Sequence, residues 1–137
     1  MAKFQFRYEK ILKLKSQIED KKKQEFSQLQ LKIQAENSKL SQLKEDLEIR
    51  YENLRQKMSG QLQLTEITRF YNEIASISNQ IQGQEIFLKE LHHHEHLKRQ
   101  ELVEAMKNRK TYEAIRKTQW EKHQAEQKKQ EQKFLHF

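Results

Sequence analysis

The sequence predicts an all-α protein, an antiparallel two-helix coiled-coil hairpin, and three observations lead to this prediction. Only 34% of the 137 residues are hydrophobic, against roughly 45–50% in globular domains. The chain has two glycines and no proline, so it lacks the turn residues that a sheet with many hairpins needs. Its apolar residues instead recur every seven positions, as a coiled-coil seam requires.

The first helix is expected over about residues 6–58. Its seven-residue series consists of Phe26, Ile33, Leu40, Leu47 and Leu54. Nearer the N-terminus, Leu14, Ile18, Lys22 and Phe26 are spaced by four. That change of spacing predicts a stutter, which locally unwinds the supercoil without ending the helix.

A turn is expected over residues 59–64, centred near Leu62. Gly60 suits the left-handed residue that closes a helix, and Thr65 is the candidate N-cap of the next one. Glu66 would complement the helix dipole in the first turn. The second helix is expected over about 65–130, and its basic C-terminal part would overhang the pairing. We expect one coiled-coil domain over residues 1–137.

The register follows from the position of the turn, because opposed residue numbers should sum to 124. Leu54 then lies opposite Phe70, and Ile33 lies opposite Leu91. Glu36 by Leu88 and Arg50 by Ile74 are imperfect pairs, which long side chains tolerate at an exposed seam. Arms of about 55 residues would form a rod of roughly 80 Å. A parallel homodimer remains the structural alternative to a monomeric hairpin.

Charge is concentrated in two separate stretches of the sequence. Residues 1–25 carry a net charge of +4, residues 26–97 carry −2, and residues 98–137 carry +5. A hairpin would bring the two basic stretches together, where they could bind an acidic partner surface. The alternative is a solvated helix face with i,i+4 charge pairs. The lysine runs at 21–23 and 128–129 are too short for a DNA-reading basic region, so we expect no nucleic-acid binding.

No residue pattern points to catalysis. The sequence contains no nucleophile elbow, phosphate-binding glycine loop or Cys-His pair, and a two-helix rod offers no pocket. His92 and His96 share a helix face but lack an obvious third ligand. We therefore expect no enzyme activity, no cofactor and no metal site, and we assign the His92–His96 run no role.

The absence of cysteine and of an apolar span or signal sequence makes the cytoplasm the expected location. Near the C-terminus, several aromatic and apolar residues have no place in the predicted seam. They are Trp120, Phe134, Leu135 and Phe137. Together with neighbouring lysines, they suggest a partner-binding tail.

Two segments resemble the FliJ family of the bacterial flagellar type III export apparatus. The first is Phe4-Gln-Phe6-Arg7-Tyr8-Glu9-Lys10-Ile-Leu-Lys-Leu-Lys15, followed by Glu19. The second runs from Glu104 to Lys117 and contains an Arg-Lys pair followed by a glutamate. The likeness is collinear and covers nearly the whole chain.

The resemblance implies a stalk-like antiparallel coiled coil that binds the ring of the export ATPase FliI. It would couple this ring to the export gate FlhA and take part in chaperone escort. We then expect a monomer without membrane insertion, held by partners at the cytoplasmic side of the membrane at the flagellar base. The implied ATPase-ring residues are Phe4, Phe6, Arg7, Lys10, Arg109, Lys110, Arg116, Lys117 and Trp120. The implied gate residues are Phe70, Ile74 and Ile77, with their neighbour Tyr71 as the exposed alternative.

Two other classes of function remain open on the residues alone. One is a generic structural coiled-coil homodimer, in which the turn has no role. The other is a basic helical protein that binds nucleic acid with a strong salt dependence.

Overall fold

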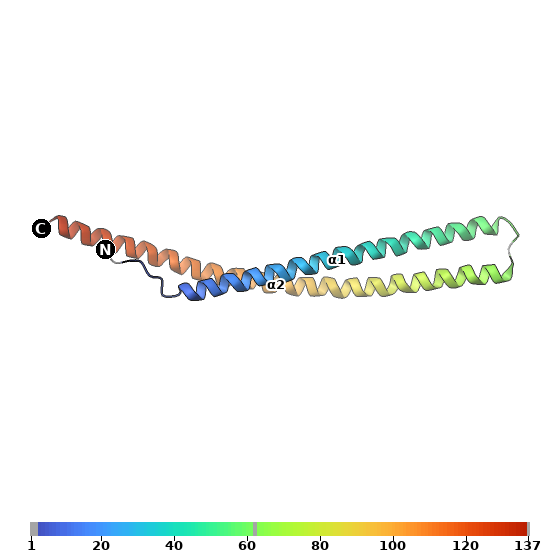
Figure 1. Cartoon of the computed structure of the whole chain (residues 1–137), viewed down its shortest axis with the longest axis horizontal. Helices are drawn as coiled ribbons and strands as arrows, with labels where there is room; N and C mark the ends of the chain where they lie inside the picture. The colour runs from blue at the N-terminus through green and yellow to red at the C-terminus, as the bar shows by residue number, and fades with distance from the viewer. Residues whose placement is uncertain (1–2, 62, 137) are drawn as a thin grey trace. The chain divides into compact units, whose positions relative to one another are not determined.

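The computed structural model of the chain describes residues 3–61 and 63–136, and their architecture is a helical hairpin. Helix α1 spans Glu9–Met58 and helix α2 spans Leu64–Leu135. The two helices run antiparallel and pack against each other (Figure 1), and the described residues contain no strand. The predicted all-α coiled-coil hairpin is therefore confirmed. In the part of the chain that the structure describes, no helix has a segment both long and apolar enough to span a bilayer.

Two compact units divide the chain. Unit 1 consists of Met1–Phe26 and Leu97–Phe137, and unit 2 consists of Ser27–His96. Each unit pairs one part of α1 with one part of α2. The expectation of a single domain stays a prediction.

The end of α1 differs from the sequence-based expectation. The Gly60 N–H donates to the Lys57 carbonyl oxygen at 3.2 Å, and the Ser59 hydroxyl donates to the Gln56 carbonyl oxygen at 2.7 Å. These bonds satisfy carbonyls that the last helical turn leaves without partners. Neither glycine has a positive φ, so the prediction of a left-handed Gly60 is wrong.

The start of α2 also differs from the prediction. Because the helix begins at Leu64, Thr65 lies inside the first turn and is not the N-cap. The Gln63 carbonyl accepts from the N–H groups of Glu66 and Ile67 at 3.0 and 3.2 Å. Glu66 does lie in the first turn, as expected. Leu62 lies outside the described residues, as does Phe137 at the other end of the chain.

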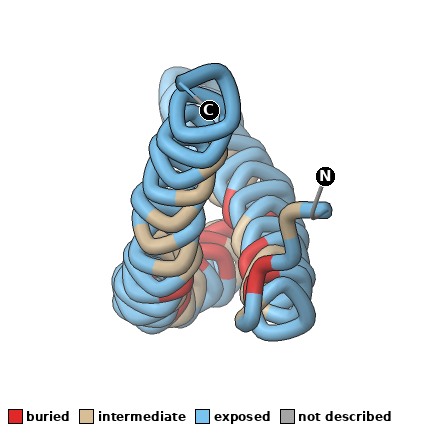
Figure 2. Tube along the Cα trace, turned by 90° about the vertical axis from the view of Figure 1, so that its left-hand side faces the viewer, coloured by how far each residue is buried: buried red, intermediate tan, exposed pale blue. Residues whose placement is uncertain are grey.

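Unit 2 is held together by apolar side chains in the predicted register. Ile33 clusters with Leu88 and Leu91, and all three are buried. Leu54 forms a second cluster with Phe70 and Ile74. Figure 2 shows the buried residues on the sides where the helices face each other.

The seam of unit 1 does not contain the predicted stutter. Leu14 and Ile18 are 53% and 37% exposed, whereas Leu12 and Glu19 are only 6% and 3% exposed. The seven-residue spacing therefore continues from Leu12 through Glu19 to Phe26. The prediction is wrong because a glutamate occupies a seam position, which a count of apolar residues cannot detect.

Candidate functional site

The two basic stretches of the sequence come together in unit 1. This unit contains 19 basic and 10 acidic residues, a net charge of +9, whereas unit 2 contains 8 and 10, a net charge of −2. A field of one sign over a surface attracts partners of the opposite sign and speeds their encounter. The candidate site is therefore sought in unit 1.

A buried charge cluster joins the two helices in unit 1. Glu19 of α1 accepts hydrogen bonds from the Nε and Nη2 atoms of Arg109 on α2. Lys23 lies 3.3 Å from the same carboxylate, and Glu113 accepts from Arg109 Nη1 at 2.8 Å. The hydrogen bond from Arg109, together with Lys23, holds the pKa of Glu19 below its usual value despite burial. The pKa of Arg109 is raised by the hydrogen bonds to Glu19 and Glu113.

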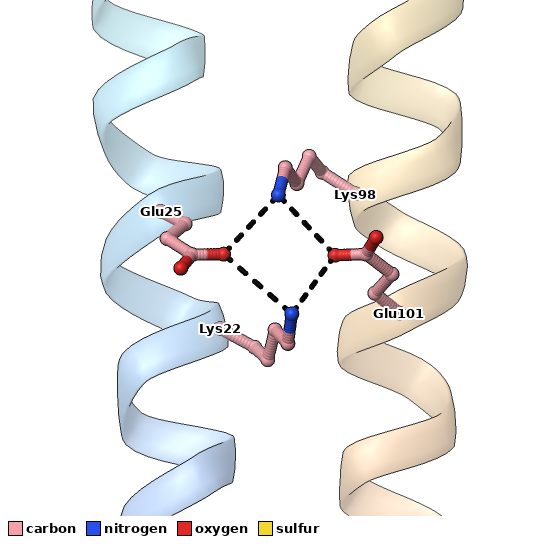
Figure 3. A network of polar contacts seen from close by, with 4 residues as sticks. All are labelled: Lys22, Glu25, Lys98 and Glu101. Carbon is pink, nitrogen blue, oxygen red and sulfur yellow. Dashed lines mark hydrogen bonds and ion pairs between the residues drawn. The ribbon is translucent and has the colours of Figure 1, made fainter.

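A second set of charges in unit 1 forms a closed ring (Figure 3). Lys98 lies 3.3 Å from both Glu25 and Glu101, and Lys22 lies 3.1 Å from Glu101 and 3.8 Å from Glu25. Hydrogen bonds to the two carboxylates raise the pKa of Lys98, and those from Lys22 and Lys98 lower the pKa of Glu101. The ring ties the helices together and leaves these four charges engaged within the chain.

Residues 3–8 precede α1 and lie along α2 (Figure 1). The Phe4 ring meets the Trp120 ring edge-on at 5.0 Å between centroids, and His123 stacks on Trp120 at 6.0 Å. Tyr8 contacts the Tyr112 ring at 6.1 Å. Trp120 thus has an aromatic partner in the segment before α1, a contact that the sequence did not predict.

A surface hollow of about 450 Å³ opens beside these rings. Its lining residues are Phe4, Glu113, Arg116, Lys117 and Trp120. Arg116 lies 3.4 Å from Glu9 and remains half exposed, whereas Lys117 forms no ion pair with any described residue. The hollow thus combines two aromatic side chains with two cations and with Glu113, whose carboxylate is bonded to Arg109. This combination suits an apolar group next to a carboxylate.

The remaining residues of the implied ATPase-ring set are in different environments. Phe6 is buried, and Arg109 is held by Glu19 and Glu113. The Arg7 guanidinium lies 5.6 Å from the Tyr8 ring centroid. Lys10 and Lys110 are exposed, and neither pairs with another described residue.

The residues implied for gate binding lie in unit 2. Phe70, Ile74 and Ile77 are each buried in the seam, at 7–8% exposure. Tyr71 is 57% exposed and is the member of this group that faces solvent.

Sequence reasoning placed Glu36 and Arg50 at the seam opposite apolar residues, but it missed their polar partners on the other helix. In unit 2, Glu36 accepts from Gln84 at 2.7 Å, and Arg50 pairs with Glu73 at 2.5 Å. The hydrogen bond from Gln84, followed by that from Lys39, lowers the pKa of Glu36. Glu36, Arg50 and Gln84 each occupy a heptad position, whereas Glu73 does not, so a search for polar residues at heptad spacing would have found the first three and missed Glu73.

The histidine run forms no compact ligand set among the described residues. His92 Nδ1 lies 3.7 Å from Glu95 Oε1. Residues 3–61 and 63–136 contain no group of three or more metal-ligating side chains close enough to hold an ion.

Comparison with known protein families identifies the family to which the chain belongs. Residues 4–135 match the family model described as "Flagellar FliJ protein". No curated protein and no solved structure is detectably similar to the chain. The matched family consists of structural components of the export apparatus and is not a known enzyme family. Because the match spans nearly the whole chain, the protein belongs to the FliJ family and is a component of the flagellar export apparatus.

Proposed function

We propose that this FliJ-family protein binds the ring of the export ATPase FliI through unit 1 and couples it to the export gate FlhA. The observation that carries the proposal is the hollow beside Phe4 and Trp120, where the two segments that resemble the family come together. It lies in the unit with a net charge of +9. Aromatic anchors surrounded by cations are suited to recognition of an acidic protein surface.

In this proposal, the residues that contact the ATPase ring are those with exposed groups around the hollow. Phe4, Trp120, Arg116 and Lys117 line it. Arg7, Lys10 and Lys110 add to the positive charge of unit 1. Phe6 and Arg109 act as positioning residues, because the first is buried and the second is engaged by two carboxylates.

Gate binding is assigned to unit 2, with Tyr71 as the direct contact. Phe70, Ile74 and Ile77 support it from the seam. Tyr71→Ala should weaken capture of the soluble part of FlhA while leaving the helix content unchanged. Phe70→Ala should lower both the capture of FlhA and the helix content, since it removes a buried side chain. Equal gate binding by Tyr71→Ala and the unaltered chain would contradict this assignment.

Coupling requires that the protein bind the conformations of the ring subunits with different affinities. A ligand shifts an equilibrium only by its differential affinity for the two states. A monomeric hairpin with a charged binding unit can exert such a bias without catalysing a reaction. We place its action at the cytoplasmic side of the membrane, through partners that include export chaperones.

The test is binding of the full chain to the purified ATPase, with light scattering to measure the mass of the complex. The single tryptophan, Trp120, provides a fluorescence signal from the hollow. A double variant with Arg116→Glu and Lys117→Glu should weaken binding about tenfold or more, because two charges of the hollow are reversed. The matched control is Lys128→Glu with Lys129→Glu, on the same helix but outside the hollow.

The two variants decide between specific contact and general attraction. The proposal is supported if the variant at Arg116 and Lys117 loses affinity and the control at Lys128 and Lys129 does not. An equal loss in both variants would mean that net charge, not the hollow, drives binding. A stable dimer of the unaltered chain with no affinity for the ATPase would refute the proposed function.

A further inference from the structure

A short apolar stripe lies on the surface of unit 1. Its members are Ile11, Leu14 and Ile18, at 37%, 53% and 37% exposure. Their spacing of three and four residues places them on one face of α1. The seam beside them is occupied by Leu12 and Glu19, and the three stripe residues keep 37–53% of their surface exposed.

Such a stripe is more than scattered surface hydrophobicity. Single exposed apolar residues are common on soluble proteins. Three contiguous residues at helical spacing instead form the pattern by which one helix recognises another, with anchors at i, i+3 and i+7.

Free lysines border the stripe on both sides. Lys15 follows Ile11 by four residues, Lys21 follows Ile18 by three, and Lys10 precedes Leu14 by four. None of these lysines forms an ion pair with a described residue, whereas the neighbouring Lys22 and Lys23 each do. Lys10 and Lys21 are exposed and Lys15 is half-buried, so at least the first two charges are accessible to a partner.

We propose that this stripe is a docking surface for an amphipathic helix whose apolar face is flanked by acidic residues. The apolar anchors would pack on the stripe, and the carboxylates would meet the bordering lysines. The three stripe residues do not line the hollow assigned to the ATPase ring. Of the bordering lysines only Lys10 is also assigned to that ring, and the inference does not depend on that proposal.

Charge and width decide among the possible occupants. A second copy of the chain would bring the same lysines face to face, and like charges disfavour that contact. A membrane surface would require a broad apolar face rich in large side chains. Three residues bordered by lysines on both sides match the narrow face of one helix better.

The probe is a capped, fluorescently labelled helical peptide of three heptads, with a leucine stripe flanked by glutamates. Its control has lysines in place of the glutamates. Fluorescence anisotropy measures its affinity for the full chain. Leu14→Ser should weaken binding of the acidic peptide about tenfold, because a leucine loses its burial. The matched control is Leu31→Ser, which changes a leucine of α1 that is 65% exposed.

A second pair of variants tests the charges. Lys15→Glu combined with Lys21→Glu should abolish the preference for the acidic peptide, whereas Lys57→Glu should leave it unchanged. Circular dichroism establishes that each variant retains its helix content. Preference for the acidic peptide, lost in Leu14→Ser and kept in Leu31→Ser, supports the proposal.

Three results would overturn the inference. The first is equal affinity for the acidic and basic peptides. The second is binding to vesicles of anionic lipid that depends on Leu14 while the acidic peptide does not bind. The third is self-association of the unaltered chain that Leu14→Ser abolishes.

Discussion

The two units use the same pair of helices with different chemistry. Unit 2 is stabilised by apolar clusters around Ile33, Leu88 and Leu54, and its net charge is −2. Unit 1 has a net charge of +9 and crosses its seam with the buried Glu19–Arg109 pair and the four-charge ring. Apolar burial gives the larger gain in stability, whereas buried ion pairs give specificity of pairing at a cost in desolvation. Unit 2 thus relies mainly on apolar burial across its seam, whereas unit 1 adds charged pairs that join the two helices.

The largest expected effect is the loss of an apolar seam residue in unit 2. Leu88→Ala should lower the free energy of unfolding by about 2–5 kcal/mol, because it leaves a cavity in the cluster with Ile33 and Leu91. Amide hydrogen exchange over residues 27–96 locates the effect, and thermal melting gives its size. Ile86→Ala is the matched control, since Ile86 is 62% exposed. Similar losses in both variants would contradict the idea that burial in the clusters stabilises unit 2.

The second-largest expected effect is a loss of stability in unit 1 when the Glu19–Arg109 pair is broken. Arg109→Ala should destabilise unit 1, because it leaves the buried Glu19 carboxylate without its main partner. Replacement of both residues by leucine should restore much of the stability, since an apolar pair needs no desolvation of charge. Hydrogen exchange of residues 9–26 and 97–120 provides the measurement. If the double variant is as unstable as Arg109→Ala, the unpaired carboxylate of Glu19 is not the cause of the destabilisation.

Acid should weaken unit 1 through the same carboxylate. The folded-state pKa of Glu19 lies below the ordinary value of 4.5. Its contribution is therefore fully present above about pH 4.5 and is lost as the pH falls through the folded-state pKa. Thermal melting between pH 7 and about pH 3 measures this loss. Glu19→Gln should be less stable at pH 7 and should show a flatter dependence on pH, and an unchanged slope would refute the assignment.

The smallest expected effect comes from the four-charge ring. Lys98→Ala should lower the melting temperature by no more than a few degrees, because solvent and salt screen partly exposed pairs. The difference from the unaltered chain should shrink in high salt. Lys44→Ala provides the comparison in unit 2, where Lys44 lies 3.7 Å from Glu85 on the other helix. A large effect of Lys98→Ala that persists in high salt would mean that the ring is a main support of unit 1.

Prediction from sequence succeeded where apolar residues carry the pattern. The hairpin and the contact of Ile33 with Leu91 follow from the seven-residue repeat. It failed at Glu19, which apolar counting excluded from the seam, and therefore at Leu14 and Ile18. It also left the contact of Trp120 with Phe4 unpredicted, because residues 3–8 follow no periodic pattern.

The sequence by itself determined that this protein is a two-helix coiled coil of the FliJ family with two basic stretches. Hydrophobic spacing and charge content are properties of the chain, and a seven-residue repeat is buried only when one helix packs along another. Only the tertiary structure decided which charges are engaged and which are free. Arg109 is an internal partner of Glu19, whereas Lys117, beside Phe4 and Trp120, pairs with no residue that the structure describes. The reason is physical, since the pairing of a charge depends on which side chains from the other helix lie within a few ångströms.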